Sequence, residues 1–90
     1  MVGAGMGARK YIQFTNLPDW DDDSIVVVHV VAGGKARVRI RTRNQTSEDL
    51  PLGEALEHAR LALNLPILEQ VAVYLDEGAV WEERFGELVS

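Results

Sequence analysis

Residues 24–43 read Ser-Ile-Val-Val-Val-His-Val-Val-Ala-Gly-Gly-Lys-Ala-Arg-Val-Arg-Ile-Arg-Thr-Arg, a pattern that predicts two strands and the turn between them. Six of the seven residues at positions 25–31 are β-branched, and such residues favour extended backbone. Gly33 and Gly34 readily adopt the positive φ angles that a tight hairpin turn requires. We therefore expect a β-hairpin from about Ser24 to Arg43, and we expect the rest of the fold to build on it.

The second strand of this hairpin carries a regular series of basic side chains. Basic residues alternate there with small or β-branched ones, and a strand repeats every two residues, so one face receives all of the cations. The cationic row defined in this way consists of Lys35, Arg37, Arg39, Arg41 and Arg43. The whole chain has a formal net charge of −5, and the four basic and fourteen acidic residues outside the row carry −10. This separation of charge makes the row the first candidate for a binding surface.

The length of the turn decides which side chains share a face, because a slip of one residue exchanges the two faces of a strand. A two-residue turn places His29 opposite Val38. A three-residue turn that includes Lys35 pairs His29 with Arg39 and directs alternate valines, beginning at Val26, into the core. In both registers three aliphatic side chains of the first strand lie on the face of the arginines, which makes that face amphipathic.

One further strand and one helix are expected on either side of the hairpin. Residues 11–15 alternate in the manner of a strand, and the acidic residues 19–23 continue the loop that follows it. A helix is expected to begin near Asp49-Leu50-Pro51, since Asp is a good N-cap and Pro is tolerated in the first turn. Asn64-Leu65-Pro66 is expected to end it through a left-handed Asn and a Pro that stops the helix. The expected buried stripe is Leu52, Ala55, Leu56, Ala59, Ala62 and Leu63.

The last quarter of the chain allows two interpretations. Residues 70–76 alternate and are rich in β-branched and aromatic side chains, which favours a strand. Glu77-Gly78 would then turn this strand into a hairpin with residues 79–81. The alternative is a helix over residues 67–75, with Asn64 as its N-cap and Gly78 as its stop.

Together these elements predict an α+β fold in the order β-β-β-α-β-β, with one helix packed on an antiparallel sheet of four to five strands. Ninety residues suffice for one small domain, which we expect at residues 9–90 after a flexible N-terminal tail at residues 1–8. The chain has no cysteine, which excludes disulfides and thiolate metal sites and fits a cytoplasmic protein. No signal peptide or long apolar segment is visible, so we expect no membrane association.

No catalytic or metal-binding motif is complete. Asp19-x-Asp21-x-Asp23 begins like a calcium loop, but Ser24 stands where that loop needs Gly and Val30 where it needs Glu. The two histidines lie in different predicted elements, and the three serines form no recognisable Ser-His-Asp arrangement. We therefore expect an interaction domain with no enzymatic activity, no cofactor and no metal.

The predicted C-terminal hairpin would place Tyr74 opposite Trp81, and on the arginine face this pair would join the cationic row as binding residues. Three uses of such a face are open. In the first, the arginines are solvated, with Asp or Glu from neighbouring segments alongside. Asp21, Asp22 and Asp23 support this, because they would enter the first strand beside the end of the second, where Arg41 and Arg43 lie. Single-stranded nucleic acid is a second possibility, because its bases stack on aromatic rings and its phosphates need cations. We favour a homodimer or a protein partner, since the acidic remainder of the chain supplies complementary carboxylates.

Overall fold

The predicted hairpin is confirmed and forms one half of the sheet. In the computed structural model, which describes residues 10–15, 20, 22–65 and 67–89, β2 (Ile25–Val31) pairs antiparallel with β3 (Lys35–Ile40). The expected tail at residues 1–8 lies outside the described residues. The φ angles of 89° at Gly33 and 76° at Gly34 are the positive values for which glycine is suited.

The turn between these strands differs from both expected turns. Val31 pairs with Lys35, so the turn contains Ala32 and the two glycines, and His29 pairs with Arg37. Because this register differs by two residues from the expected three-residue turn, it keeps the same faces. The valines that alternate from Val26 therefore point into the core, and His29 lies on the face of the arginines.

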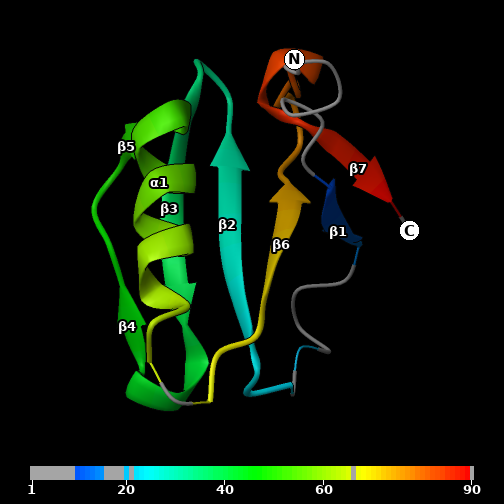
Figure 1. Cartoon of the computed structure of the whole chain (residues 1–90). Coiled ribbons are helices and arrows are strands. Elements are labelled where there is room, and N and C mark those ends of the chain that lie inside the picture. The colour runs from blue at the N-terminus through cyan, green and yellow to red at the C-terminus, as the bar shows by residue number, and fades with distance from the viewer. Residues whose placement is uncertain (1–9, 16–19, 21, 66, 90) are drawn as a thin grey trace.

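The sheet is mixed rather than antiparallel. Its central strand β6 (Gln70–Leu75) lies between β2 and β1 (Lys10–Phe14) and runs parallel to both, and β7 (Glu87–Val89) runs parallel to β1 at one edge. Two short strands, β4 (Gln45–Thr46) and β5 (Leu50–Pro51), pair with β3 at the other edge. The strand order is β4-β3-β2-β6-β1-β7, with β5 beside β3 (Figure 1). The α+β class with a single packed helix is confirmed, with more strands than the expected four or five.

The strand predicted at residues 70–76 is confirmed, but the hairpin predicted after it is wrong. Both edges of β6 are already hydrogen-bonded, one to β1 and one to β2, so no edge remains for a hairpin partner. Residues 79–81 accordingly form no strand. The chain instead passes through the short 3-10 helix η3 (Glu83–Phe85) and enters β7 beside β1.

The helix α1 (Leu52–Ala62) begins and ends in a different way from the expectation. Its N-cap is Pro51 rather than Asp49, because Leu50–Pro51 pairs with β3 as β5 and brings the chain to the helix in extended form. Its C-cap is Leu63 in a right-handed conformation, and Asn64 does not adopt the expected positive φ. Within the described residues no helix has the length and apolar character needed to cross a membrane.

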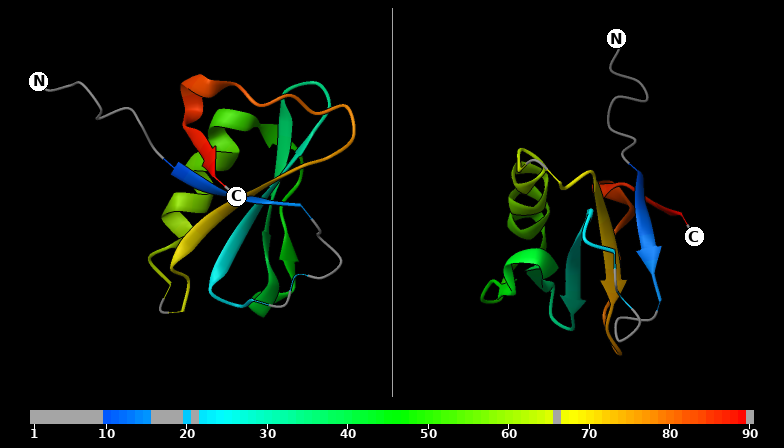
Figure 2. Two further views of the ribbon diagram at one scale, coloured as in Figure 1. Left: turned by 90° about the vertical axis from the view of Figure 1, so that its right-hand side faces the viewer. Right: turned by 90° about the horizontal axis from the view of Figure 1, so that it is seen from below.

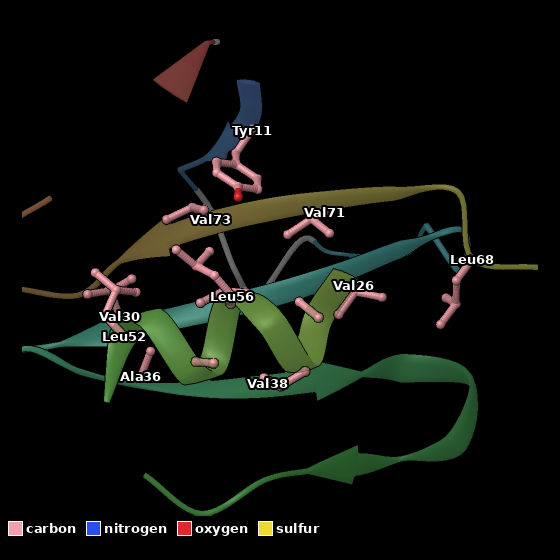
Figure 3. Close-up of a cluster of buried hydrophobic side chains, with 13 residues drawn as sticks. Tyr11, Val26, Val30, Ala36, Val38, Leu52, Leu56, Leu68, Val71 and Val73 are labelled. Atoms are coloured by element: carbon pink, nitrogen blue, oxygen red, sulfur yellow. The ribbon is translucent and has the colours of Figure 1, made fainter. Parts of the chain in front are cut away.

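The helix packs on β2 and β3, at the end of the sheet away from β1 and β7 (Figures 1 and 2). Its apolar side chains and those of the sheet point toward one another in a single core (Figure 3). Four of the six residues of the expected helical stripe are buried, and the other two, Ala62 and Leu63, are partly buried against the same core. Among the described residues α1 is the only α-helix, and it covers one face of the sheet.

We expect the replacement Leu56→Ala to lower the free energy of unfolding by about 2–4 kcal/mol, since the leucine side chain is 3% exposed and its truncation leaves a cavity. Leu61 is the matched control, because it lies on the same helix but is 63% exposed. Leu61→Ala should cost less than about 0.5 kcal/mol. Urea unfolding of both variants checks the assignment, and equal losses would contradict this packing of the helix.

Candidate functional site: the open face of the sheet

The face of the sheet opposite α1 carries a second, smaller apolar cluster. Strand pairing aligns Ile12 with Ala72 and Phe14 with Tyr74, so alternate residues of neighbouring strands gather on this side. Three members of the cluster are buried, namely Ile25, Val27 and Ala72, and four are partly buried, namely Ile12, Phe14, Trp20 and Tyr74. This cluster, together with His29 and the basic residues of β3, is termed the open face. Its side chains are partly covered by one another, and within the described chain no helix covers them.

The cationic row has three members on the sheet rather than five. Lys35, Arg37 and Arg39 alternate along β3 as expected. The chain then leaves the extended conformation in the 3-10 helix η2 (Arg41–Arg43), which removes Arg41 and Arg43 from the row. Asn44 causes this change of direction. Its φ angle is 50°, and its backbone N–H donates a hydrogen bond to the carbonyl of Arg41, so the chain reverses and enters β4.

Carboxylates neutralise two of the arginines, Arg37 and Arg41. The interpretation of the row as solvated arginines with Asp or Glu alongside expected such pairs. The Nε group of Arg37 pairs with Asp49, which raises the pKa of that guanidinium, and Nη1 of Arg41 pairs with Asp23. Both pairs are partly exposed, so each contributes little to stability. Among the described residues Arg39 has no carboxylate partner. It is half-buried and is aligned across the hairpin with Val27 of the apolar cluster.

Tyr74 and Trp81 do not form the expected aromatic pair. Tyr74 lies on the open face, whereas Trp81 packs on the helix side, with its ring centroid 5.9 Å from that of Tyr11. The indole N–H of Trp81 donates to the carbonyl of Gly86 at 3.0 Å. This difference follows from the absence of the C-terminal hairpin, which was the only reason to place the two rings opposite each other.

Two further aromatic residues belong to the same cluster as Tyr74: Phe14, which is aligned with Tyr74 on the neighbouring strand, and Trp20. Neither was expected from the sequence as a site residue. The rings of Phe14 and Trp20 meet edge to face at 6.4 Å. The indole N–H of Trp20 donates to the carbonyl of Asp22 at 2.8 Å, and the Asp22 carboxylate accepts hydrogen bonds from the hydroxyl and N–H of Ser24. These bonds lower the pKa of Asp22. The hydrogen bonds of Asp22 therefore help to hold Trp20 in place beside the sheet.

His29 lies on the open face near the C-terminal end of β2, and apart from Tyr11 it is the only buried residue with a polar side chain among the described residues. It is 7% exposed, and its ring meets that of Tyr74 edge to face at 5.0 Å. The Nε group of Arg39 donates to its Nδ1 atom at 3.2 Å. Its Nε2 atom is 3.5 Å from a carboxylate oxygen of Asp76, too far for a full hydrogen bond, and has no hydrogen-bond partner in the described structure.

This environment keeps the imidazole neutral. Burial lowers the pKa of His29 below its usual 6.5, and the positive charge of Arg39 lowers that pKa further, against a smaller opposing effect of Asp76. A guanidinium can only donate, so Nδ1 is the unprotonated nitrogen and Nε2 carries the hydrogen. The histidine therefore acts as a hydrogen-bond acceptor that orients Arg39.

A small recess of about 130 Å³ adjoins this cluster at the end of β3. Trp20, Arg39 and Arg41 contribute to its lining, so it combines an indole with two guanidinium groups. Two larger hollows of about 490 Å³ each lie between α1 and β1 and share Tyr11 and Arg60. Basic and acidic side chains both line the larger hollows, which gives them no clear charge preference, so the open face remains the better candidate site.

No protein-family model, curated protein or solved structure matches the chain. Its function is therefore inferred from the geometry alone.

The lowered pKa of His29 predicts that the fold loses stability in mild acid. As the pH falls through 6.5, the unfolded chain binds a proton at this residue before the folded chain does, so unfolding becomes more favourable. The free energy of unfolding should therefore rise with pH across the interval from the lowered pKa up to 6.5, and should level off above it. Urea unfolding at a series of pH values should show this slope in the wild type and in His58→Asn, which changes an exposed histidine. The slope should be reduced in His29→Asn, and an equal slope in all three proteins would contradict the assignment.

Proposed function

We propose that this protein is a non-enzymatic interaction domain that self-associates through the open face. The observation that carries the proposal is an apolar patch, formed by three partly buried aromatic rings, beside an arginine that has no carboxylate partner in the described structure. Aromatic residues and arginine are enriched at the centres of protein interfaces. A partner that supplies apolar side chains and a carboxylate fits such a surface.

A second copy of the chain fits these requirements. Of the five main strands in the order β3-β2-β6-β1-β7, β6 is the middle one. A two-fold axis that runs along β6 would stack Tyr74 and its neighbours on the same cluster of the partner. Neighbouring strands are about 5 Å apart, so this axis would also bring β3 of one copy over β7 of the other.

Charge complementarity favours this arrangement. Glu87 on β7 is aligned with Lys10, and their register places them on the open face at the edge opposite β3. Glu87 is exposed, and it forms no ion pair with another described residue. In the two-fold arrangement Glu87 of each copy would lie within side-chain reach of Arg39 of the other, with two such contacts per dimer.

Single-stranded nucleic acid is the second candidate. Phe14 and Tyr74 are partly buried rings on adjacent strands, and such rings can stack on bases. Two observations argue against it: carboxylates already neutralise Arg37 and Arg41, and the chain has a net charge of −5. A polyanion would meet little uncompensated positive charge on this face.

We expect Arg39→Glu to weaken self-association by at least about tenfold, which corresponds to about 1.4 kcal/mol, because it replaces an attraction to Glu87 by a repulsion. Glu87→Arg alone should weaken association in the same way. The double variant Arg39→Glu/Glu87→Arg should recover much of it, since the attraction is restored with exchanged signs. Sedimentation equilibrium gives the dissociation constants, and circular dichroism verifies that each variant is folded.

Arg84→Glu is the matched control, because Arg84 is exposed and lines a hollow on the helix side of the sheet. It should leave association unchanged. A wild type that sediments as a monomer at every concentration would refute self-association. If that monomer binds a short single-stranded oligonucleotide and Arg39→Glu does not, the nucleic-acid hypothesis takes its place.

A further inference from the structure

The guanidinium of Arg39 is held on one side and available on the other. Its Nε group donates to Nδ1 of the buried His29. Neither of its two Nη groups has an acceptor among the described residues. The edge formed by two Nη groups matches the two oxygens of a carboxylate, and a guanidinium that is already fixed loses less freedom when it binds one.

The hold on Arg39 depends on the charge of His29. A neutral imidazole with its hydrogen on Nε2 can accept at Nδ1, whereas an imidazolium has hydrogens on both nitrogens and can accept at neither. Protonation would therefore place the N–H of Nδ1 opposite the N–H of Arg39 Nε, so that two donors face each other, and would add a positive charge beside Arg39. It would also strengthen the attraction of Nε2 to Asp76, which lies 3.5 Å away.

Charges of both signs surround the imidazole. The described charged and titratable groups that face it are Arg37 and Arg39 from β3 and Tyr74 and Asp76 from β6. The two arginines oppose protonation, and Asp76 is the only described anion in the set. The neighbours of His29 along β2 are aliphatic.

We propose that His29 is a positioning residue that controls self-association by its protonation state: the neutral imidazole holds Arg39 ready for a carboxylate of a second copy, and the imidazolium releases it. This inference rests on the proposed self-association and adds its regulation. The lowered pKa of His29 is consistent with it, because the holding form is then the major one at neutral pH. A fall in pH through the titration of His29 becomes the signal for dissociation.

The first measurement tests the hold on Arg39 without reference to any partner. In nitrogen-15 NMR spectra the Nε–H resonance of Arg39 should be visible and slowly exchanging at neutral pH. It should weaken along the same titration curve as the Cε1–H resonance of His29. In His29→Asn the side-chain carbonyl provides an acceptor near the Nδ1 position that does not titrate, so the resonance should persist through the same pH range. A resonance that persists in the wild type after His29 is protonated would overturn the proposal.

The second measurement tests the consequence for association. As the pH falls through the His29 titration, the dissociation constant of the wild type should rise by at least about tenfold, and the midpoint of this rise should coincide with the midpoint of that titration. His29→Asn should associate with little dependence on pH, and His58→Asn should behave as the wild type. Near-ultraviolet circular dichroism identifies the pH range in which each protein is folded, and the dissociation constants are compared within that range.

The two proposals fail in different ways. A wild-type dimer whose dissociation constant does not change as His29 titrates would overturn the role of His29 and leave self-association intact. The same holds if His29→Asn retains the pH dependence of the wild type. A wild type that is monomeric at every pH would overturn both proposals.

Discussion

The insertion of β6 between β2 and β1 is the constraint on which the rest of this structure depends. Its parallel hydrogen bonds on both edges join the hairpin to the N-terminal strand and make β6 the centre of the sheet. Since side chains alternate along a strand, Val71 and Val73 enter the core beneath the helix while Ala72 and Tyr74 face the other way. One strand thus contributes to both apolar clusters.

The single helix leaves the two faces of the sheet unequal. The side chains of one face are buried against α1, whereas those of the other face are covered mainly by one another. Aromatic rings serve this purpose well, because Phe14, Trp20 and Tyr74 are large enough to shield the small buried residues below them. The same rings remain partly accessible, which is why an arrangement that stabilises the monomer also suits a partner.

Much of the fold could be predicted from local patterns. The hairpin, the helix and the strand at residues 70–75 each have a strong periodicity, and all three are present. The parallel partners of β6 could not be predicted, because nothing local distinguishes a strand that turns back as a hairpin from one that crosses to a distant neighbour. The error in the placement of Trp81 has the same origin, since its face depends on that connection.

The candidate site was predicted in part. Arg37, Arg39 and Tyr74 do share a face, and Asp23 does meet Arg41, because alternation and hairpin geometry are local properties. The exit of Arg41 from the strand depends on the left-handed conformation of Asn44, which is compatible with but not required by its sequence. The contacts of Trp20 and His29 arise only when distant segments are brought together, so composition alone could not reveal them.

The central claim, that two copies meet face to face over β6, can be tested most directly by a distance between them. The chain has no cysteine, so a nitroxide label on Gln70→Cys reports one site per copy, on the open side of β6. Facing sheets lie about 10 Å apart, so the account predicts a label–label distance of about 10–20 Å by electron paramagnetic resonance. Labels on Leu61→Cys, on the outer side of the helix, should be about 30 Å or more apart, because both helix layers then stand between them. A dimer in which the labels at position 61 are the closer pair would contradict the account.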